Sequence, residues 1–170
     1  EQADVVNHLA TTKDQFACTL LNGVTGSGKT EVYFQTIACQ LEAGKRTLLL
    51  VPEIGLTPQL LSRLKKRFNN RVLALHSGFT EHQRLNAWQQ PSLGQADIII
   101  GTRSALFTPI PNLGLIIIDE EHDQAYKQQE GFRYHGRDLA IKRASDANIP
   151  ILLGSATPSL ESIANVARGR

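Results

Sequence analysis

Short apolar runs alternate along the chain with segments of helical length. The runs lie at residues 19–21, 47–51, 71–75, 97–100, 115–118 and 151–153. Most of them are continuous Val, Ile and Leu, which is typical of strands that are buried on both faces of a parallel sheet. Strands that alternate with helices in this way are joined by right-handed crossovers. We therefore expect an α/β fold: a doubly wound, mostly parallel sheet with helices on both faces.

Helices are expected between these strands, and several carry local end signals. The expected segments are residues 30–43, 58–68, 80–89, 137–147 and 158–168. Gly44 suits the position after a helix C-terminus, and Pro58 suits the start of a helix. Thr80 and Gln83 form a capping-box pattern. Two longer loops remain, at residues 102–114 and 123–136. In open α/β sheets, ligands bind beyond the carboxyl ends of the strands, and the motifs described below fall there.

Composition excludes several classes of protein. The apolar runs are far shorter than the roughly 20 residues of a transmembrane helix, so we expect no membrane span. The two cysteines, Cys18 and Cys39, cannot form a four-cysteine zinc site, and we expect no zinc in this chain and a reduced, cytoplasmic setting. The net charge of +2 is too small to indicate a nucleic-acid partner. A length of 170 residues predicts one domain, residues 1–170. Because these residues contain no methionine, we expect that domain to be excised from a longer protein.

Residues 23–30 read Gly-Val-Thr-Gly-Ser-Gly-Lys-Thr and match the phosphate-binding motif G-x-x-x-x-G-K-[ST] throughout. The segment follows an expected strand and opens an expected helix, which is the context that the motif requires. Its glycines let backbone amides approach phosphate oxygens, and the helix directs its positive end at the same anion. We expect the lysine to contact the β- and γ-phosphates and the last threonine to ligate Mg²⁺. The residues expected to bind ATP here are Gly23, Thr25, Gly26, Ser27, Gly28, Lys29 and Thr30.

Acidic residues follow directly after the apolar strand at residues 115–118, in the order Asp-Glu-Glu-His. In ATPases with a phosphate-binding loop, such an aspartate holds Mg²⁺ and a neighbouring carboxylate orients the attacking water. We assign the metal to Asp119 and the water to Glu120, so that Lys29, Asp119 and Glu120 are the expected catalytic residues. For Glu121, a solvated acid at the start of a helix is an equally good interpretation.

These two motifs, together with Gly-Ser-Ala-Thr at residues 154–157, resemble the first motor lobe of superfamily-2 helicases, a RecA-like lobe with a phosphate-binding loop. Further stretches extend the likeness over nearly the whole chain, and they resemble the replication-restart DNA helicases of that superfamily. The stretches are residues 23–33, 51–59, 76–78, 101–109, 118–123, 126–131 and 154–158.

The resemblance implies an ATP-dependent DNA helicase that unwinds forked DNA in replication restart and primosome assembly. It implies that hydrolysis of ATP with Mg²⁺ drives translocation on single-stranded DNA. It also implies a second lobe of the same chain, which lies outside these residues and supplies an arginine, and primosome proteins as partners. The lobe alone is expected to be poorly active. Two alternatives remain: a nucleotide-switched fork-binding and partner-loading module without motor activity, and another superfamily-2 DNA translocase.

The resemblance carries further site residues over by position. Gln2 corresponds to a glutamine that reads adenine, since an amide both donates and accepts, although an exposed terminal glutamine is the alternative. His122, Ser155 and Thr157 correspond to the set that couples the hydrolysis site to the DNA side. For Ser155 and Thr157, capping of the helix that follows Pro158 is a second interpretation.

Two segments resemble those that touch the phosphate backbone of single-stranded DNA in the family. Backbone amides, hydroxyls and a guanidinium suit this contact and carry no sequence code. The expected residues are Gly55, Thr57, Thr102, Arg103 and Ser104. A basic cluster nearby, which runs from Arg63 to Arg71, is better explained as a solvated helix face. Trp88 is expected in the core.

The loop after the acidic motif interleaves aromatic and basic residues, and it resembles the aromatic-rich loop that couples DNA binding to hydrolysis in related helicases. Aromatic rings offer stacking platforms worth about 1–3 kcal/mol per base, while cations follow the backbone. The residues expected to bind DNA are Tyr126, Lys127, Phe132, Arg133 and Tyr134. The family pattern has tryptophan where Phe132 stands. The alternative is a packed loop whose aromatics cover the end of the sheet.

Overall fold

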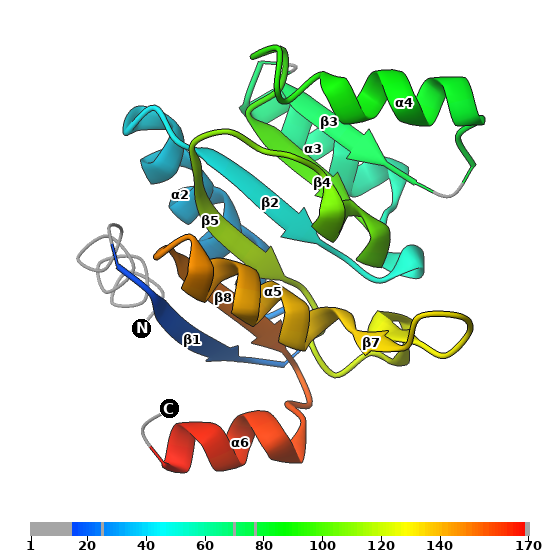
Figure 1. Ribbon diagram of the computed structural model, residues 1–170. Helices are drawn as coiled ribbons and strands as arrows, with labels where there is room; N and C mark the ends of the chain where they lie inside the picture. Colours follow the sequence, from blue (N-terminus) through cyan, green and yellow to red (C-terminus); the bar gives the residue numbers. More distant parts are fainter. Residues whose placement is uncertain (1–14, 25, 70, 77, 169–170) are drawn as a thin grey trace.

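A single parallel sheet organises the described part of the molecule (Figure 1). The computed structural model describes residues 15–24, 26–69, 71–76 and 78–168. Within them, six strands lie in the order β1-β8-β5-β2-β4-β3, and all neighbouring pairs are parallel. The strands are β1 (Ala17–Asn22), β2 (Arg46–Leu50), β3 (Val72–Leu75), β4 (Ile98–Gly101), β5 (Leu113–Ile118) and β8 (Pro150–Ser155). The expected parallel sheet is therefore confirmed.

The expected helices are also present, with small shifts at their ends. They are α2 (Lys29–Glu42), α3 (Pro58–Arg67), α4 (Glu81–Gln89), α5 (Gly136–Asp146) and α6 (Leu160–Ala167). Thr57 caps α3 by accepting a hydrogen bond from the Leu60 amide, with proline in the first turn. Thr80 and Gln83 make both bonds of the capping box. Gly44 follows α2 with φ of 70°, a conformation that favours glycine.

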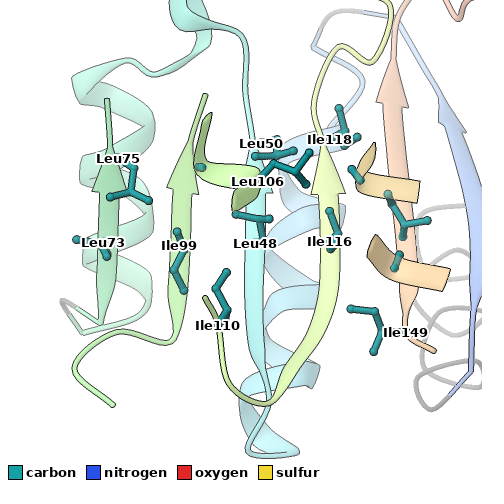
Figure 2. Packing of buried hydrophobic residues seen from close by; sticks show 14 of the residues in the cluster. Leu48, Leu50, Leu73, Leu75, Ile99, Leu106, Ile110, Ile116, Ile118 and Ile149 are labelled. Carbon is teal, nitrogen blue, oxygen red and sulfur yellow. The ribbon is translucent and has the colours of Figure 1, made fainter. Parts of the chain in front are cut away.

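Side chains of the strands alternate between two apolar layers, one on each face of the sheet. Leu48 belongs to the layer shown in Figure 2, which includes Ala87 of α4 and Ala140 of α5. Leu49 points the other way, into a layer that includes Ile37 of α2 and residues of α3. Because burial of each Leu or Ile contributes about 1.5–3 kcal/mol, both layers stabilise the sheet substantially. Helices on both faces confirm the doubly wound arrangement.

Several short elements connect the strands, and the sequence pattern did not predict them. Three are 3₁₀ turns: η1 (Glu53–Gly55), η2 (Arg103–Phe107) and η3 (Gln124–Tyr126). The loop after β5 also contains an antiparallel ribbon made of β6 (Lys127–Gln128) and β7 (Tyr134–His135). Strands of two residues are too short to leave a periodic signal in the sequence. No helix within the described ranges is long and apolar enough to cross a membrane.

The prediction that Trp88 belongs to the core is wrong. Its side chain is 42% exposed, and Ala87 is the buried residue of α4. Helix α4 packs on the sheet mainly through this small residue, so its larger apolar side chains remain at the surface.

Candidate functional site

The segment after β1 forms a tight loop around a lysine. Gly26 and Gly28 have φ of 81° and 88°, in the left-handed region that side chains rarely adopt. A Cβ on Gly23 would lie 2.6 Å from the Ser27 hydroxyl oxygen, so a larger residue would disturb the loop. The Lys29 side chain is 9% exposed, and its Nζ donates to the Gly23 carbonyl oxygen at 2.6 Å. The loop thus curls over the lysine ammonium at the N-terminus of α2.

The acidic turn after β5 meets this loop. The Lys29 Nζ lies 3.6 Å from Oε1 of Glu120. Glu120 has φ of 48°, a left-handed conformation that costs a non-glycine residue about 1–3 kcal/mol and is most frequent at functional sites. The Glu121 amide donates to the Gly154 carbonyl at 3.0 Å, which pins the turn to β8. The ends of β1, β5 and β8 therefore bring a buried cation and the acidic pair to one place.

Asp119 is held by two tyrosines. The Tyr33 hydroxyl donates to its Oδ1 at 2.8 Å, and the Tyr126 hydroxyl donates to its backbone carbonyl at 2.7 Å. Burial raises the pKa of the Asp119 carboxyl, while the Tyr33 hydrogen bond and the charge of Lys29 act in the opposite direction. Sequence reasoning missed Tyr33. The signal available was a hydroxyl one helical turn after Lys29 and Thr30, on the side of α2 that faces the sheet.

The donor set beside the loop fits a magnesium ion that is bound together with a nucleotide. Thr30 supplies a hydroxyl in the first turn of α2, and Asp119 supplies a carboxylate. In the part of the chain that the structure describes, no three His, Cys, Asp or Glu side chains form a metal-binding group. Mg²⁺ is usually bound by one or two protein carboxylates together with waters and substrate phosphates, so it does not require such a group.

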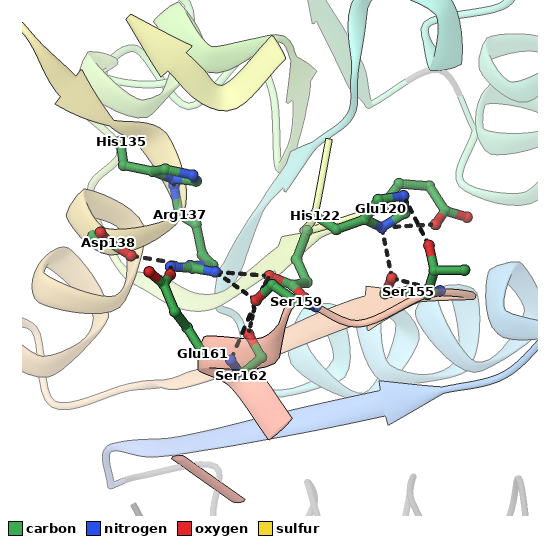
Figure 3. Close-up of polar contacts among 11 residues, drawn as sticks. Glu120, His122, His135, Arg137, Asp138, Ser155, Ser159, Glu161 and Ser162 are labelled. Carbon is green, nitrogen blue, oxygen red and sulfur yellow. Dashed lines mark hydrogen bonds and ion pairs between the residues drawn. The ribbon is translucent and has the colours of Figure 1, made fainter. Parts of the chain in front are cut away.

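His122 joins the acidic turn to the segment after β8 (Figure 3). Its Nδ1 lies 2.7 Å from the Ser155 hydroxyl, and its Nε2 lies 3.1 Å from the Thr157 hydroxyl. The Ala156 amide donates to Oε2 of Glu120 at 3.3 Å. The structure thus brings the three predicted coupling residues into direct contact. The second interpretation, that Ser155 and Thr157 cap the next helix, is wrong, because Ser159 caps α6.

Glu121 is not a solvated acid. Its side chain is 0% exposed, and it accepts hydrogen bonds from Arg137 at 3.1 Å and from the Ser159 amide at 2.7 Å. Arg137, itself 6% exposed, also pairs with Asp138 and Glu161 (Figure 3). This buried network fastens the acidic turn to the N-termini of α5 and α6.

A groove of about 620 Å³ lies at the same edge of the sheet, between the ends of β2, β3 and β4 and the ribbon. Predicted DNA-contact residues that line it are Thr102, Arg103, Ser104, Tyr126, Phe132 and Tyr134. Other lining residues that sequence reasoning missed include Glu53, His76, Arg84 and Gln128. Glu53, His76 and Gln128 lie in stretches that carry the resemblance, and Arg84 does not. Nothing in the sequence indicates that the four share a groove, because they come from separate segments that only the fold brings together.

The remaining predicted DNA-contact residues lie around this groove. Thr57 is exposed at the start of α3, next to Leu56 and Pro58, which line an adjoining cavity of about 480 Å³. Gly55 ends η1, just before this segment. The side chain of Lys127 in β6 is exposed, and so is that of Arg133 in the loop between β6 and β7.

Arg103 holds the segment before the ribbon and its first strand through hydrogen bonds to backbone carbonyls. Its guanidinium donates to the Ala125 carbonyl at 3.0 Å and to the Lys127 carbonyl, and it lies 5.8 Å from the centre of the Tyr134 ring. The aromatics differ in exposure: Phe132 is 81% exposed, whereas Tyr126 is 0% exposed. The buried Tyr126 ring has no face to offer a base in this structure, so the packed-loop interpretation describes Tyr126 and not Phe132.

Two predicted residues, Gln2 and Thr25, lie outside the described residues. All other predicted ATP-binding residues lie in the loop after β1 or in the first turn of α2.

Known proteins resemble this chain in both sequence and structure. The solved structure of RecG bound to a three-way DNA junction superposes with a TM-score of 0.67 and 26% identity, and the match covers 99% of this chain and 22% of that one. A hypothetical ATP-dependent RNA helicase from Sulfolobus tokodaii gives a TM-score of 0.66 at 20% identity, over 98% of this chain and 48% of that one. These matches confirm the expected RecA-like fold.

Sequence relatives are closer. Replication restart protein PriA of Haemophilus influenzae is 61% identical over 151 residues, which is 89% of this chain and 21% of the relative. The protein of the same name from Bacillus subtilis is 49% identical over 156 residues, 92% of this chain and 19% of the relative. The chain thus spans about a fifth of the length of these relatives. The model of the DEAD/DEAH box helicase family matches residues 1–166, and the chain belongs to that family.

Proposed function

We propose that residues 1–170 are the ATP-binding first lobe of an ATP-dependent DNA helicase that acts in replication restart. The observation that carries the proposal is the meeting of the Lys29 loop and the Asp119–Glu120 turn, with Lys29 Nζ 3.6 Å from Glu120. The relatives named replication restart proteins support the biological setting.

ATP binds with its phosphates in the loop at residues 23–30, where Lys29 neutralises charge on the β- and γ-phosphates. Thr30 and Asp119 hold magnesium, which supplies further neutralisation of the charge that develops on the phosphates. Glu120 orients the attacking water, since its carboxylate is already positioned by Lys29 and by the Ala156 amide. Gln2 reads the adenine edge.

The triad of His122, Ser155 and Thr157 couples this site to DNA. Its hydrogen bonds join the water-orienting turn to the segment after β8. A shift of Glu120 on nucleotide binding therefore moves Thr157 through these hydrogen bonds, and the Thr157 side chain is at the surface.

Single-stranded DNA lies along the 620 Å³ groove. Phe132 and Tyr134 stack on bases, and Lys127 and Arg133 follow the phosphates. Thr102 and Ser104, together with Thr57 at the adjoining cavity, donate to phosphate oxygens. Gly55 lies next to this path, and its amide donates to the Pro52 carbonyl at 2.8 Å. Arg103 and Tyr126 also line this path, and their polar groups hold the segment before and within the ribbon in place.

A second lobe of the same chain closes on the γ-phosphate and supplies an arginine, a contribution of roughly 10³–10⁵ in rate in related NTPases. This lobe alone therefore hydrolyses ATP slowly. Forked DNA is the substrate of the complete protein, and primosome proteins are its partners.

DNA-stimulated ATP hydrolysis and unwinding of forked DNA by the complete helicase test the proposal. Lys29→Ala abolishes both activities. The control is Lys142→Ala on α5, whose exposed side chain pairs with Asp146 away from the loop, and it keeps wild-type rates. Turnover that survives Lys29→Ala contradicts the assignment of the phosphate site.

A non-hydrolysable ATP analogue separates a motor from a switch. A motor separates the strands of a fork only with ATP. Strand separation that proceeds equally well with the analogue identifies a nucleotide-switched binding module instead.

A further inference from the structure

Tyr33 stands out because its hydroxyl reaches the proposed metal carboxylate from α2, the helix that follows the loop at residues 23–30. It lies in the first half of α2, three residues after Thr30 and four after Lys29. Its side chain is 2% exposed, and Oη donates to Oδ1 of Asp119 at 2.8 Å. A buried phenol needs a hydrogen-bond partner, and this one uses a charged carboxylate.

Strand β8 has a glycine, Gly154, where the Tyr33 side chain packs against it. A Cβ on Gly154 would lie 1.7 Å from the Tyr33 oxygen and 2.8 Å from the ring carbon that bears it. No side chain fits at position 154 while the ring stays where it is. The glycine is therefore explained by the close approach of the tyrosine.

The hydrogen bond fixes the carboxylate in two respects. It engages Oδ1 and so restrains the rotation of the carboxylate, which also accepts a backbone hydrogen bond at Glu120. It also ties Asp119 to the helix that carries Thr30, since residues three apart on a helix lie on the same side. Tyr33 thus links the two elements that carry the proposed magnesium ligands.

We infer that Tyr33 is a positioning residue for magnesium, which orients the Asp119 carboxylate relative to the Thr30 hydroxyl. This inference rests on the proposed function, in which Asp119 is the magnesium carboxylate. Hydrogen-bond partners that orient metal ligands typically change metal affinity or activity by about 10–100-fold when they are removed.

The test is the magnesium dependence of nucleotide binding, measured with a fluorescent ATP analogue on the complete helicase. Tyr33→Phe keeps the ring and removes only the hydroxyl. The expected result is a half-saturating Mg²⁺ concentration raised about 10-fold, with affinity for the analogue in EDTA unchanged. A half-saturating concentration equal to that of the wild type overturns the inference.

A matched control lies on the same helix. Thr36→Val removes another buried hydroxyl of α2, which donates to the Val32 carbonyl and does not contact Asp119. It leaves the magnesium dependence at the wild-type value. An equal shift in Thr36→Val means that loosening of α2 is the cause, which also overturns the inference.

Asp119→Asn distinguishes failure of this inference from failure of the proposed function. If Asp119→Asn changes the magnesium dependence and Tyr33→Phe does not, only the role of Tyr33 is wrong. If Asp119→Asn has no effect, Asp119 is not the magnesium carboxylate, and the proposed site and the inference that rests on it both fail.

Discussion

Individual residues at this site are constrained by close contacts with segments far away in the sequence. The side chain of Tyr33, from α2, packs directly against Gly154, and the Gly154 carbonyl accepts a hydrogen bond from the Glu121 amide. Glu120 adopts φ of 48° in the same turn. Such unusual backbone and close packing are kept where a carboxylate has to be placed with precision.

Gly154→Ala should destabilise the protein by about 1–3 kcal/mol, because the new methyl group overlaps the Tyr33 side chain. Urea unfolding measures this. In the Tyr33→Phe background the cost should be smaller, since the closest overlap is with the hydroxyl. A suitable control is Gly78→Ala, where the new methyl meets the exposed ring of His76 at 3.2 Å and that ring can move aside. Equal costs in both backgrounds contradict the explanation.

Contiguous motifs predicted the residues Lys29, Asp119 and Glu120, because loop and strand end are local features that sequence patterns record. The roles of Tyr33 and of the buried Glu121 could not be predicted in this way. Each depends on a contact between segments far apart in the chain, such as Tyr33 with Asp119, 86 residues later. Amino-acid type left a solvated position for Glu121 as an equally good interpretation, because the arginine that pairs with it comes from α5.

At the level of elements, Arg137 joins three parts of the fold. It is 6% exposed and connects the turn after β5 with α5 and α6. A buried pair that loses one partner leaves an uncompensated charge, here on the fully buried Glu121.

Arg137→Leu should therefore cost about 3–5 kcal/mol in the free energy of unfolding. Urea unfolding again measures the change. Lys142→Leu, which breaks an exposed pair with Asp146 on the same helix, should cost under about 1 kcal/mol. A small loss for Arg137→Leu would contradict the role assigned to this buried pair.

Acid should weaken the attachment of α6. The hydrogen bond from Arg137 lowers the pKa of Glu161 below its ordinary value, so the folded state binds this proton less readily than the unfolded chain does. The pair's contribution is present above the unfolded pKa and is lost as the pH falls through the lowered folded value. The difference in Tm between wild type and Glu161→Gln should thus be present at neutral pH and vanish in acid. A difference that is constant with pH contradicts this.

Elements were predictable where a buried face repeats. The continuous apolar strands and the capped helices α3 and α4 leave such signals. The ribbon of β6 and β7 does not, since each strand has two residues. The prediction that Trp88 is buried was wrong for a related reason. Helical periodicity does not show how closely a helix packs on the sheet, and α4 buries only Ala87 among its described residues.

At the level of the whole molecule, the strand order puts the proposed ATP site and the proposed DNA groove on one edge of the sheet. The loop at residues 23–30 follows β1, the acidic turn follows β5, and the groove opens at the ends of β2, β3 and β4. Tyr126 joins the two regions, because it lines the groove and donates to the Asp119 carbonyl.

Phe132→Ala in the complete helicase should weaken binding of a single-stranded oligonucleotide by about 1–3 kcal/mol, roughly 5–150-fold, because an exposed stacking surface is lost. Fluorescence anisotropy with a labelled oligonucleotide measures this. Trp88→Ala removes an exposed aromatic from α4, outside the 620 Å³ groove, and should leave affinity unchanged. If Trp88→Ala weakens binding and Phe132→Ala does not, the DNA path runs over α4 instead.

A crystal structure of the protein with a non-hydrolysable ATP analogue and Mn²⁺ tests most directly whether the loop at residues 23–30 and Asp119 form one site for ATP and its metal ion. Mn²⁺ accepts the same oxygen ligands as Mg²⁺, and its anomalous signal locates it without ambiguity. We predict one manganese ion between the Thr30 hydroxyl and the Asp119 carboxylate, with the γ-phosphate against Lys29. An analogue bound outside the loop at residues 23–30, or a manganese ion remote from Asp119, would contradict the proposed ATP site.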